Sequence, residues 1–349
     1  MAETVLLGFS GGVDSAVTAL LLRKQGYVVE TAFMAVRGAS GHGCGVAGDA
    51  DAAAALARQL DFPFRAVDCS RQYGETVLGN FRSEYLAGRT PNPCVVCNPG
   101  LKFAVLPELA EEAGVRFDWF ATGHYARVEY NEAAGRFVLL RGSDLGKDQS
   151  FFLHRLTREQ LARVKFPLGG MTKKETRELA AEWNVSVMNK PDSQDFYGGD
   201  YAELLGVGGR IGEIVDTRGR VLGTHDGYWR FTPGQRKGLG VAFSEPLYVI
   251  RIEPGENRVV VGTREEELSR GCVVADWVEG GGVLAPGLEC MGRIRSAQPL
   301  RKMRVVAVDG GTATVEFAER VQGVAPGQSL VLYDGDMVTG GGVIRERLA

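Results

Sequence analysis

The residues near the start of the chain that are best suited to chemistry are Ser10-Gly11-Gly12-Val13-Asp14-Ser15. This run follows an apolar stretch, 5–9, and precedes a helix-like stretch, 16–24. A strand, a glycine turn and a helix start direct backbone N–H groups and the positive end of the helix dipole at one point, which favours phosphate. The common phosphate loop has a lysine after its glycines. Here none follows, so we expect hydroxyls, amides and Mg²⁺ to carry that role, unless the run is only a structural Gly-Gly turn.

A second candidate lies in the segment 88–98, which reads Gly-Arg-Thr-Pro-Asn-Pro-Cys-Val-Val-Cys-Asn. Its two prolines, Pro91 and Pro93, fix the backbone, so we expect a rigid loop that presents Cys94 and Cys97. Such a Cys-x-x-Cys pair can form a redox couple, hold a metal or cluster with further ligands, or present one nucleophilic thiol. A zinc site of four cysteines needs a second close pair, and the other four cysteines contain none. The remaining alternative is two unreactive thiols.

Two shorter polar groups follow. In Ala121-Thr122-Gly123-His124-Tyr125, the glycine would let a nucleotide approach the backbone closely, and His124 is either a structural histidine or a site residue. Residues 146–150 combine Lys147, Asp148 and Gln149 in a polar loop before an apolar run, which by itself indicates little.

The composition limits the classes of protein that fit. The 349 residues, 44% hydrophobic and 24% charged, predict a folded protein of two or three domains. No apolar run has the length of a membrane span and the first residues lack a basic secretory start, so we expect a cytoplasmic protein with reduced cysteines and no membrane partner. A net charge of −3 excludes a uniformly basic surface, although local patches could still bind nucleic acid.

The pattern along the chain predicts an α/β fold in its first part. Strands expected at 28–35, 63–69 and 117–122 alternate with helices expected at 49–60 and 102–113, which predicts a doubly wound parallel sheet. Ser10, Met34 and Gly123 lie at strand ends and could face one crevice. Beyond about Tyr201, short β-rich runs broken by glycine predict two small β-rich domains. The strands expected there are 212–215, 228–231, 247–252, 258–261, 272–277, 304–308, 313–317 and 329–333. We therefore predict domains at 1–203, 204–265 and 266–349.

Taken in order, these motifs resemble the bacterial tRNA-specific 2-thiouridylase family (the MnmA type), within the PP-loop pyrophosphatase class. The resemblance covers almost the whole chain and includes four further motifs: Phe33-Met34, Asp192-Ser193-Gln194-Asp195, the run 232–240 (Thr-Pro-Gly-Gln-Arg-Lys-Gly-Leu-Gly) and Pro326-Gly327-Gln328-Ser329. It implies a first domain of the adenine nucleotide alpha hydrolase type. It also implies thiolation of the wobble uridine (U34) of tRNA: ATP adenylates O2 of the base, and activated sulfur then attacks carbon 2, so that AMP and pyrophosphate are released.

The resemblance also implies the site residues. Catalysis would fall on Cys97, Cys94 and Asp14. ATP would contact Gly8, Phe9, Ser10, Gly11, Gly12, Val13, Asp14, Ser15, Met34 and Gly123, and tRNA would contact Asn92, Pro93, Cys94, His124, Lys147, Asp148, Gln149, Arg295, Ser296 and Gln328. Ser296 stands where the family has a tyrosine. Phosphate contacts are further expected from Arg236, Lys237, Arg293, Arg301, Lys302 and Arg304.

Two departures concern the sulfur chemistry. Cys94 replaces the family's usual aspartate, and Tyr197 stands where the family has its second, persulfide-carrying cysteine. In one solution Cys94 and Cys97 work alone, one receiving sulfane sulfur and the other resolving it as a disulfide. In the other, both hold a [4Fe-4S] cluster with Cys44 as third ligand. A sulfur-donor protein or sulfide is the implied partner.

Two rival functions remain at this point. A PP-loop ligase acting on a small molecule would use the same adenylate chemistry, but the cysteine segment and the two β-rich domains argue against it. A non-catalytic tRNA-binding or sulfur-carrier homologue would explain Tyr197. The intact Asp14 and Ser15 argue against that, because no role in binding alone needs them.

Overall fold

The computed structural model describes residues 2–36, 47–189 and 201–349. The chain divides into two compact units. The first contains residues 1–77, 93–199 and 336–338, and the second contains 78–92, 200–335 and 339–349. Cys44 and the motif 192–197, including Tyr197, lie outside the described residues.

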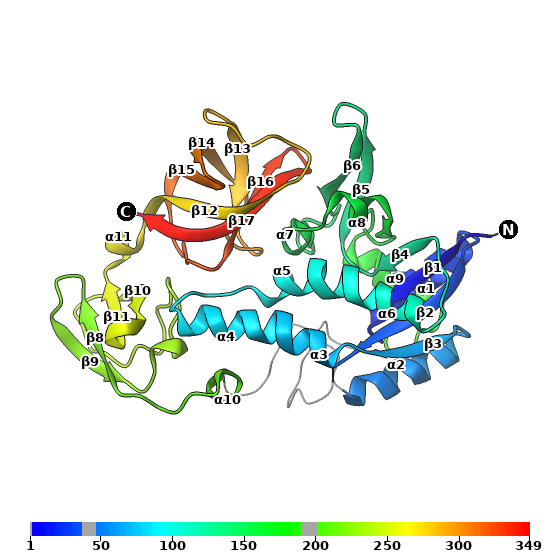
Figure 1. Cartoon of the computed structure of the whole chain (residues 1–349), viewed down its shortest axis with the longest axis horizontal. Helices are drawn as coiled ribbons and strands as arrows, with labels where there is room; N and C mark the ends of the chain where they lie inside the picture. Colours follow the sequence, from blue (N-terminus) through cyan, green and yellow to red (C-terminus); the bar gives the residue numbers. More distant parts are fainter. Residues whose placement is uncertain (1, 37–46, 190–200) are drawn as a thin grey trace. The chain divides into compact units, whose positions relative to one another are not determined.

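The first unit is built on a parallel sheet with the strand order β3-β2-β1-β4-β7 (Figure 1). Its strands are β1 (Thr4–Gly8), β2 (Val28–Ala35), β3 (Phe64–Asp68), β4 (Trp119–Thr122) and β7 (Val164–Lys165). The strand order reverses direction between β1 and β4, and ligands of open parallel sheets bind beyond the carboxyl ends of strands at such a switch point. The glycine run and Gly123 follow these two strands directly.

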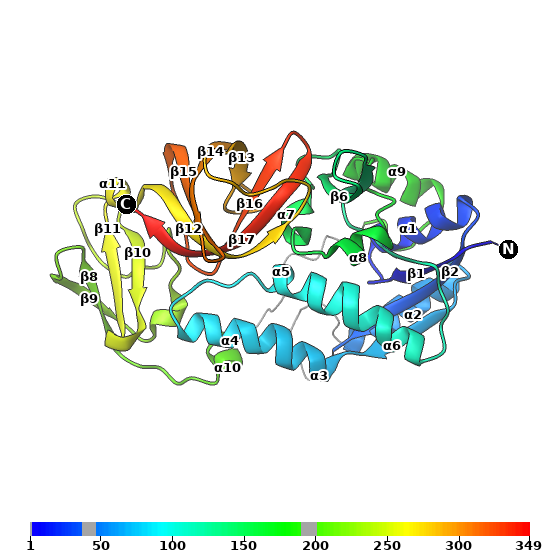
Figure 2. The same cartoon turned by 45° about the horizontal axis from the view of Figure 1, so that its top comes forward.

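Helices at 13–24, 47–59 and 106–112 contact strands of this sheet, and a hairpin of β5 (Ala126–Asn131) and β6 (Arg136–Arg141) follows β4. The helices of the first part of the chain are α1 (Val13–Lys24), α2 (Ala47–Gln59), α3 (Ser70–Tyr73), η1 (Gly74–Leu78), α5 (Pro93–Cys97), η2 (Asn98–Val105), α6 (Leu106–Glu112), α7 (Ser150–Leu153), α8 (Arg158–Ala162) and α9 (Lys173–Glu182). Helices α1 and α9 lie side by side (Figures 1 and 2).

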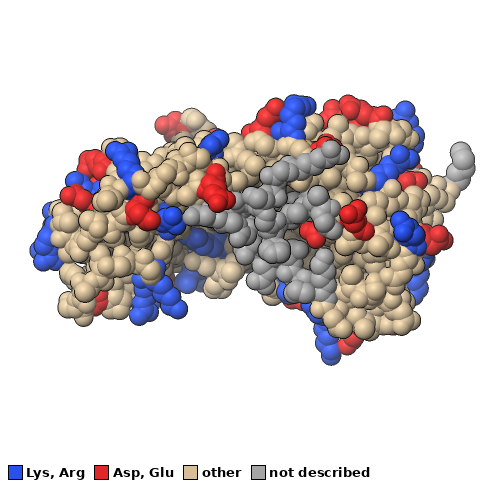
Figure 3. Space-filling view, turned by 90° about the horizontal axis from the view of Figure 1, so that it is seen from below, with Lys and Arg blue, Asp and Glu red and all other residues tan. Residues whose placement is uncertain are grey.

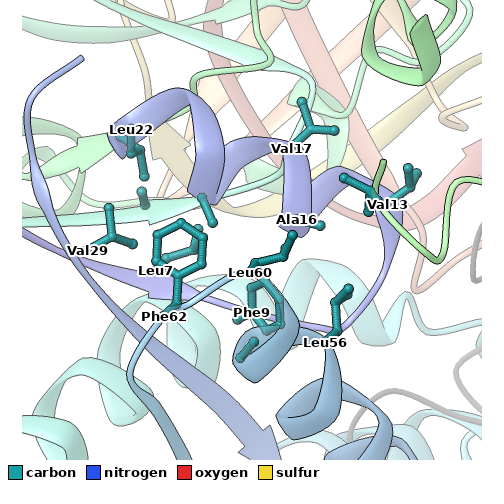
Figure 4. Close-up of a cluster of buried hydrophobic side chains, with 14 of the residues drawn as sticks. Leu7, Phe9, Val13, Ala16, Val17, Leu22, Val29, Leu56, Leu60 and Phe62 are labelled. Atoms are coloured by element: carbon teal, nitrogen blue, oxygen red, sulfur yellow. The ribbon is translucent and has the colours of Figure 1, made fainter. Parts of the chain in front are cut away.

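The core of this unit lies where α1, α2 and α9 pack on the sheet (Figure 4). Leu7 of β1, Ala16 of α1 and Ala57 of α2 are each fully buried. Across the sheet, Phe120 of β4 contacts Phe103 of η2 edge to face, with ring centroids 5.4 Å apart. Because β1 is covered on both faces, its sequence Val-Leu-Leu is apolar without alternation, as in buried parallel strands.

The second unit contains two β structures. In the first, β10 (Tyr248–Glu253), β11 (Arg258–Gly262), β8 (Gly212–Asp216) and β9 (Val221–His225) form one sheet in that order. In the second, β12 pairs with both β15 and β17, so the strands close on themselves (Figure 2). That barrel contains β12 (Ser269–Glu279), β13 (Glu289–Arg293), β14 (Arg301–Asp309), β15 (Thr312–Val321), β16 (Ser329–Asp334) and β17 (Met337–Leu348). The helices here are α4 (Gly79–Leu86), α10 (Tyr201–Leu205), η3 (Tyr228–Arg230), η4 (Pro254–Glu256) and α11 (Arg264–Glu267).

The predicted fold class is confirmed: a doubly wound parallel sheet comes first and β-rich structure follows. The predicted strand 228–231 is wrong, because Tyr228–Arg230 is a 3₁₀ turn after Gly227. Six strands were not predicted: β5, β6, β7, β9, β13 and β17. Three of them, β9, β13 and β17, contain glycine that interrupts the apolar pattern, as in Gly340-Gly341-Gly342 of β17.

On the face shown in Figure 3, Lys and Arg are interspersed with Asp and Glu. This agrees with the net charge of −3, which excludes a uniformly basic surface. Among the described residues, every helix is too short or too polar to cross a bilayer.

His154 is a buried titratable group in the first unit, and it makes stability depend on pH. Burial lowers the pKa of His154 to about 4, while its hydrogen bond to the Phe151 carbonyl works against that shift. The unfolded chain, with a histidine pKa near 6.5, therefore binds more protons between about pH 6.5 and 4, and stability is lost as pH falls through that window.

We predict that His154→Gln weakens this pH dependence. The loss of unfolding free energy between pH 7 and 4.5, measured by urea unfolding, should be about 2 kcal/mol smaller in the variant than in the wild type. Equal losses in the two proteins would contradict the assignment to His154.

Candidate active site

The glycine run forms a tight turn between β1 and α1. Gly11 has a φ of 72°, and a Cβ atom there would lie 2.8 Å from the Cβ of Ala53. Ser15 Oγ donates to the Gly12 carbonyl at 3.0 Å, and Ser10 Oγ donates to Ser15 Oγ at 3.3 Å. Only glycine fits at position 11, because any side chain would both strain the backbone and meet α2. The turn therefore presents backbone and hydroxyl groups at the start of α1.

Asp14, in the first turn of α1, is the most highly bonded group at this turn. Lys173 Nζ of α9 lies 2.7 Å from Oδ1 and 2.8 Å from Oδ2 of Asp14. Tyr125 donates its hydroxyl to Asp14 Oδ1 at 3.0 Å, and that hydroxyl also lies 2.9 Å from Thr176 Oγ1. The turn that lacks a lysine in sequence thus receives an ammonium group from a helix 159 residues away.

Sequence reasoning missed Lys173, Tyr125 and Thr176. The pattern Thr172-x-x-Glu175 is a capping box, present here with both reciprocal hydrogen bonds, and it could have located the start of α9. It could not have named Asp14 as the partner of Lys173, because that pairing exists only once α9 packs on α1.

The strand ends place the other predicted nucleotide residues around the turn. A Cβ atom on Gly123 would lie 3.0 Å from the backbone carbon of Asp14, so the end of β4 approaches α1 closely. Gly8 ends β1, and Met34 lies near the end of β2. Phe9 and Val13 point into the core (Figure 4), so they offer a ligand only their backbone groups.

The cysteine segment is not a loop throughout, which corrects the prediction. Residues 88–92 are irregular, but Pro93 begins α5, which continues as η2 and α6 to Glu112. Proline is compatible with the first turn of a helix because the N–H it lacks would have no partner there. Cys94 and Cys97, three residues apart on the helix, share one face. Cys94 is exposed and Cys97 is partly exposed.

Two amide side chains form hydrogen bonds that hold this helix in place. Asn98, which is buried, donates to the Phe152 carbonyl at 3.0 Å. Gln160 of α8 donates to the carbonyls of Pro99 and Phe103, at 2.8 and 3.2 Å. The segment η2 is a π-helix, and the Gln160 amide adds hydrogen bonds to two of its carbonyls. Sequence reasoning missed both residues.

The other described cysteines are poor nucleophiles. Burial raises the pKa of the Cys69 thiol to about 11, that of Cys272 to about 12 and that of Cys290 to about 11. Within residues 2–36, 47–189 and 201–349, no group of three or more His, Cys, Asp or Glu side chains could hold a metal ion. Cys44, the expected third ligand of a cluster, lies outside those ranges.

The polar loop before α7 is organised by Asp148. Its carboxylate accepts from the backbone N–H groups of Gly142 and Ser150, each at 3.0 Å, and from the Ser150 hydroxyl. Gln149 Oε1 accepts from the Tyr125 N–H at 2.9 Å, and Lys147 is exposed. Asp148 therefore shapes the loop, and Lys147 is the group it presents to solvent.

His124 has an apolar setting. Its Nδ1 lies 2.6 Å from Thr122 Oγ1, and its ring packs against those of Phe103 and Phe166. Burial, followed by the positive charge of Lys102, holds the pKa of His124 well below its usual range. Its ring is neutral at neutral pH, so it could contact a base or a hydroxyl but not pair with a phosphate as a cation.

In the second unit, Gln328 holds the loop that precedes the cysteines. Its Nε2 donates to the carbonyls of Thr90 and Pro91, at 2.9 and 3.1 Å. The Thr90 N–H in turn donates to the Pro326 carbonyl at 2.8 Å. Gln328 is 8% exposed, so its amide serves mainly to fix residues 90–91, directly before Asn92.

The arginines near β13 have internal partners. Arg293 is 4% exposed and donates to the Tyr333 hydroxyl and the Ser296 carbonyl, so the expectation that it contacts phosphate is wrong. Arg295 donates to the carbonyls of Gly323 and Pro233, and burial lowers its pKa. Ser296 is partly exposed.

Comparison with known proteins identifies the family. The sequence matches the family models described as tRNA methyl transferase HUP domain over residues 3–197, tRNA methyl transferase PRC-barrel domain over 206–263 and aminomethyltransferase beta-barrel domain over 277–344. A tRNA-specific 2-thiouridylase MnmA of Endomicrobium trichonymphae is 42% identical over 97% of this chain and 98% of its own length. The proteins of that name from Geobacter metallireducens and a Picosynechococcus species are 43% and 42% identical, over 98% and 97% of this chain and 96% and 98% of their own. The chain belongs to the tRNA-specific 2-thiouridylase (MnmA) family.

Membership confirms the predicted class of activity: the chain is an ATP-dependent tRNA sulfurtransferase that thiolates uridine at carbon 2. Neither the small-molecule ligase nor the non-catalytic homologue is favoured. The fold agrees, since a parallel-sheet domain of the PP-loop class is followed by a PRC-barrel and a second β-barrel domain.

We predict that Gly11→Ala lowers ATP affinity at least tenfold, because a methyl group there meets α2 and strains the turn. Gly26→Ala is the matched control: Gly26 also has a positive φ, 92°, but nothing lies within 4 Å of its added Cβ. It should lose about 1 kcal/mol of stability and keep its ATP affinity, measured by calorimetry. Equal ATP affinities in all three proteins would contradict the assignment of the turn.

A second prediction concerns Gln328→Leu, which leaves the carbonyls of Thr90 and Pro91 without a donor. Losing these bonds should cost about 1–3 kcal/mol locally and speed hydrogen exchange at the Thr90 amide about tenfold or more, with ATP affinity unchanged. Unchanged protection at Thr90 together with weaker tRNA binding would instead make Gln328 a contact residue alone.

Proposed function

We propose that this enzyme thiolates the wobble uridine of tRNA with ATP bound at the glycine turn and sulfur carried on the helix of Cys94 and Cys97. One observation carries the sulfur part: Cys94 is the only exposed cysteine among the described residues, and the partly exposed Cys97 shares its helical face. The nucleotide part rests on the strand–turn–helix geometry at a switch point of the sheet. The wobble position itself comes from the family resemblance.

Mg²⁺ fits the turn as a companion of ATP. Asp14 is the one carboxylate on the run 10–15, and its side chain is about a third exposed. Oxygen ligands and phosphate are the partners Mg²⁺ prefers, and Asp14, Ser10 and Ser15 would hold it. When bound, the ion would neutralise charge on the phosphates. The turn itself orients the nucleotide through its backbone N–H groups.

Adenylation makes the base reactive. O2 of the uracil attacks the α-phosphorus, the bond from phosphorus to the bridging oxygen breaks, and pyrophosphate leaves with the electron pair. The proton of N3 passes to water in this step and returns when the thiolated base is released. The adenylated oxygen is then a good leaving group at carbon 2.

The exposed Cys94 is the natural acceptor of sulfane sulfur, since a donor protein must reach it. The terminal sulfur of the Cys94 persulfide attacks carbon 2, and AMP leaves with its oxygen. Cys97 thiolate then attacks Sγ of Cys94, so the bond between the two sulfane-linked sulfurs breaks and the thiolated base departs. The resulting Cys94–Cys97 disulfide is reduced by a cytosolic dithiol.

A [4Fe-4S] cluster on Cys94, Cys97 and Cys44 is the alternative form of the same site. Two thiols on one helical face suit neighbouring ligands of a cluster, but the described residues supply no third ligand. The described residues alone therefore do not fit a cluster. The iron content of the active enzyme distinguishes the dithiol form of the site from the cluster form.

The remaining proposed contacts concern tRNA. Asn92, Pro93 and Cys94 would meet the target base; Lys147, Gln149 and His124 would meet the neighbouring nucleotides, with Asp148 shaping their loop. Arg295, Ser296 and Gln328 would act from the second unit, whose domains we propose to begin near residues 204 and 266. The reaction would take place in the cytoplasm, where thiols remain reduced.

The test uses cysteine variants with tRNA, ATP, Mg²⁺ and a persulfide donor, without added reductant. Cys94→Ser should form no protein persulfide and no 2-thiouridine, a loss of at least a thousandfold measured by nucleoside mass spectrometry. Cys97→Ser should still load sulfur, and it should accumulate a covalent adduct between Cys94 and tRNA because the second thiol is missing.

Cys290→Ser, in the barrel and partly buried, is the control and should keep wild-type activity. All proteins should bind tRNA alike. Full thiolation by Cys94→Ser would contradict the carrier role, and activity that requires bound iron in the wild type would replace the dithiol route with the cluster. Absence of 2-thiouridine from the wild type under either condition would overturn the proposed reaction.

A further inference from the structure

The most unusual charged group of the first unit is the ion pair of Lys173 with Asp14. Lys173 is 8% exposed, and its ammonium contacts both carboxylate oxygens. This pair adds little net stability, because the Lys173 ammonium has left water and the partly exposed Asp14 carboxylate is screened by it. Its place at a turn built to bind an anion therefore calls for a reason other than stability.

The turn needs a cation that its own sequence lacks. The run 10–15 carries one charged residue, Asp14, and that charge would repel the phosphates of ATP. Lys173 cancels it. The ammonium lies at the first turn of α1, next to the backbone N–H groups that would meet the phosphates.

Lys173 is held in place at both ends. Its backbone N–H, the first of α9, donates to Asp144 Oδ2 at 2.9 Å. Its side chain passes Tyr125, with Nζ 5.7 Å from the ring centroid, and ends on Asp14. Tyr125 also contacts Asp14 and Thr176, so the carboxylate keeps a hydrogen-bond donor when the ammonium moves away.

We propose that Lys173 is a catalytic residue of adenylation, one that moves from Asp14 to the β-phosphate when ATP and Mg²⁺ bind. Asp14 then holds the metal ion, and Lys173 stabilises the charge that develops on pyrophosphate as the bond from the α-phosphorus breaks. No bond forms to Lys173, and its protons stay in place. The inference rests on the proposed function, since it assigns a role within that nucleotide site.

The test compares Lys173→Gln with the wild type and with Lys174→Gln. Lys174 is the neighbouring lysine on α9, it is largely exposed, and it pairs only weakly with Glu178 at 3.7 Å. Pyrophosphate release in the presence of tRNA and MgATP is measured together with ATP and AMP affinity. We expect Lys173→Gln to release pyrophosphate at least a hundredfold more slowly and to bind ATP at least tenfold more weakly, with AMP affinity within twofold of wild type.

The AMP measurement separates this role from a structural one. A residue that merely supports the turn would weaken both nucleotides alike, whereas a contact to the β-phosphate affects ATP alone. Lys174→Gln should match the wild type throughout. If Lys173→Gln does not fold, Lys173→Arg keeps the charge and the pair, and should show a smaller loss for ATP and none for AMP.

Equal loss of ATP and AMP affinity in the variant, or pyrophosphate release within threefold of wild type, would overturn the role of Lys173 while the proposed function stands. A wild-type enzyme that releases no pyrophosphate with tRNA would instead overturn the proposed function itself. The two failures therefore give different results.

Discussion

The carboxylate of Asp14 is the point on which the first unit's site depends. It lies in the first turn of α1, and residues that follow β4, residues of α9 and the glycine turn converge on it. The close approach of Gly123 to the Asp14 backbone brings the ends of β1 and β4 together, which is the switch point of the sheet. A parallel sheet offers such a point once, where its strand order reverses. The candidate nucleotide site therefore lies there, because the topology leaves no equivalent place elsewhere in the sheet.

The helix that carries Cys94 and Cys97 depends on contacts with other elements. Its two thiols need an exact orientation, yet it contains prolines at 93, 99 and 107, which a regular helix tolerates poorly. Pro93 stands at a helix start, where its missing N–H costs nothing. At Pro99 the helix widens into π turns, and the Gln160 amide takes up two carbonyls there. Gln160 of α8 thus adds hydrogen bonds to a helix that prolines interrupt.

Local patterns in the sequence were sufficient for the parts of the fold that they encode. The run 10–15 between a strand and a helix, and the apolar strands of the sheet, predicted the turn and its surroundings correctly. The pairing of Lys173 with Asp14 could not be predicted, because it joins residues 159 positions apart through packing alone. The predicted phosphate contact of Arg293 was wrong for the same reason. The sequence shows only a basic residue, and its hydrogen bond to the Tyr333 hydroxyl exists only in the folded barrel. Prolines around Cys94 suggested a loop because a helix start and a rigid loop share that signature.

Placing both thiols on one helix changes what the enzyme must do during turnover. Two cysteines far apart in the chain have to be brought together for each transfer, and closing a long loop costs conformational entropy. Cys94 and Cys97 are held at neighbouring positions on a helix that Asn98 and Gln160 fasten, so that cost is met once, when the chain folds. By the family resemblance, Tyr197 stands where the second cysteine is expected, and in the proposed mechanism Cys94 supplies that second thiol at a point fixed by packing. In the proposed mechanism the same rigidity limits the reach of the sulfur, so the target base must come to the helix.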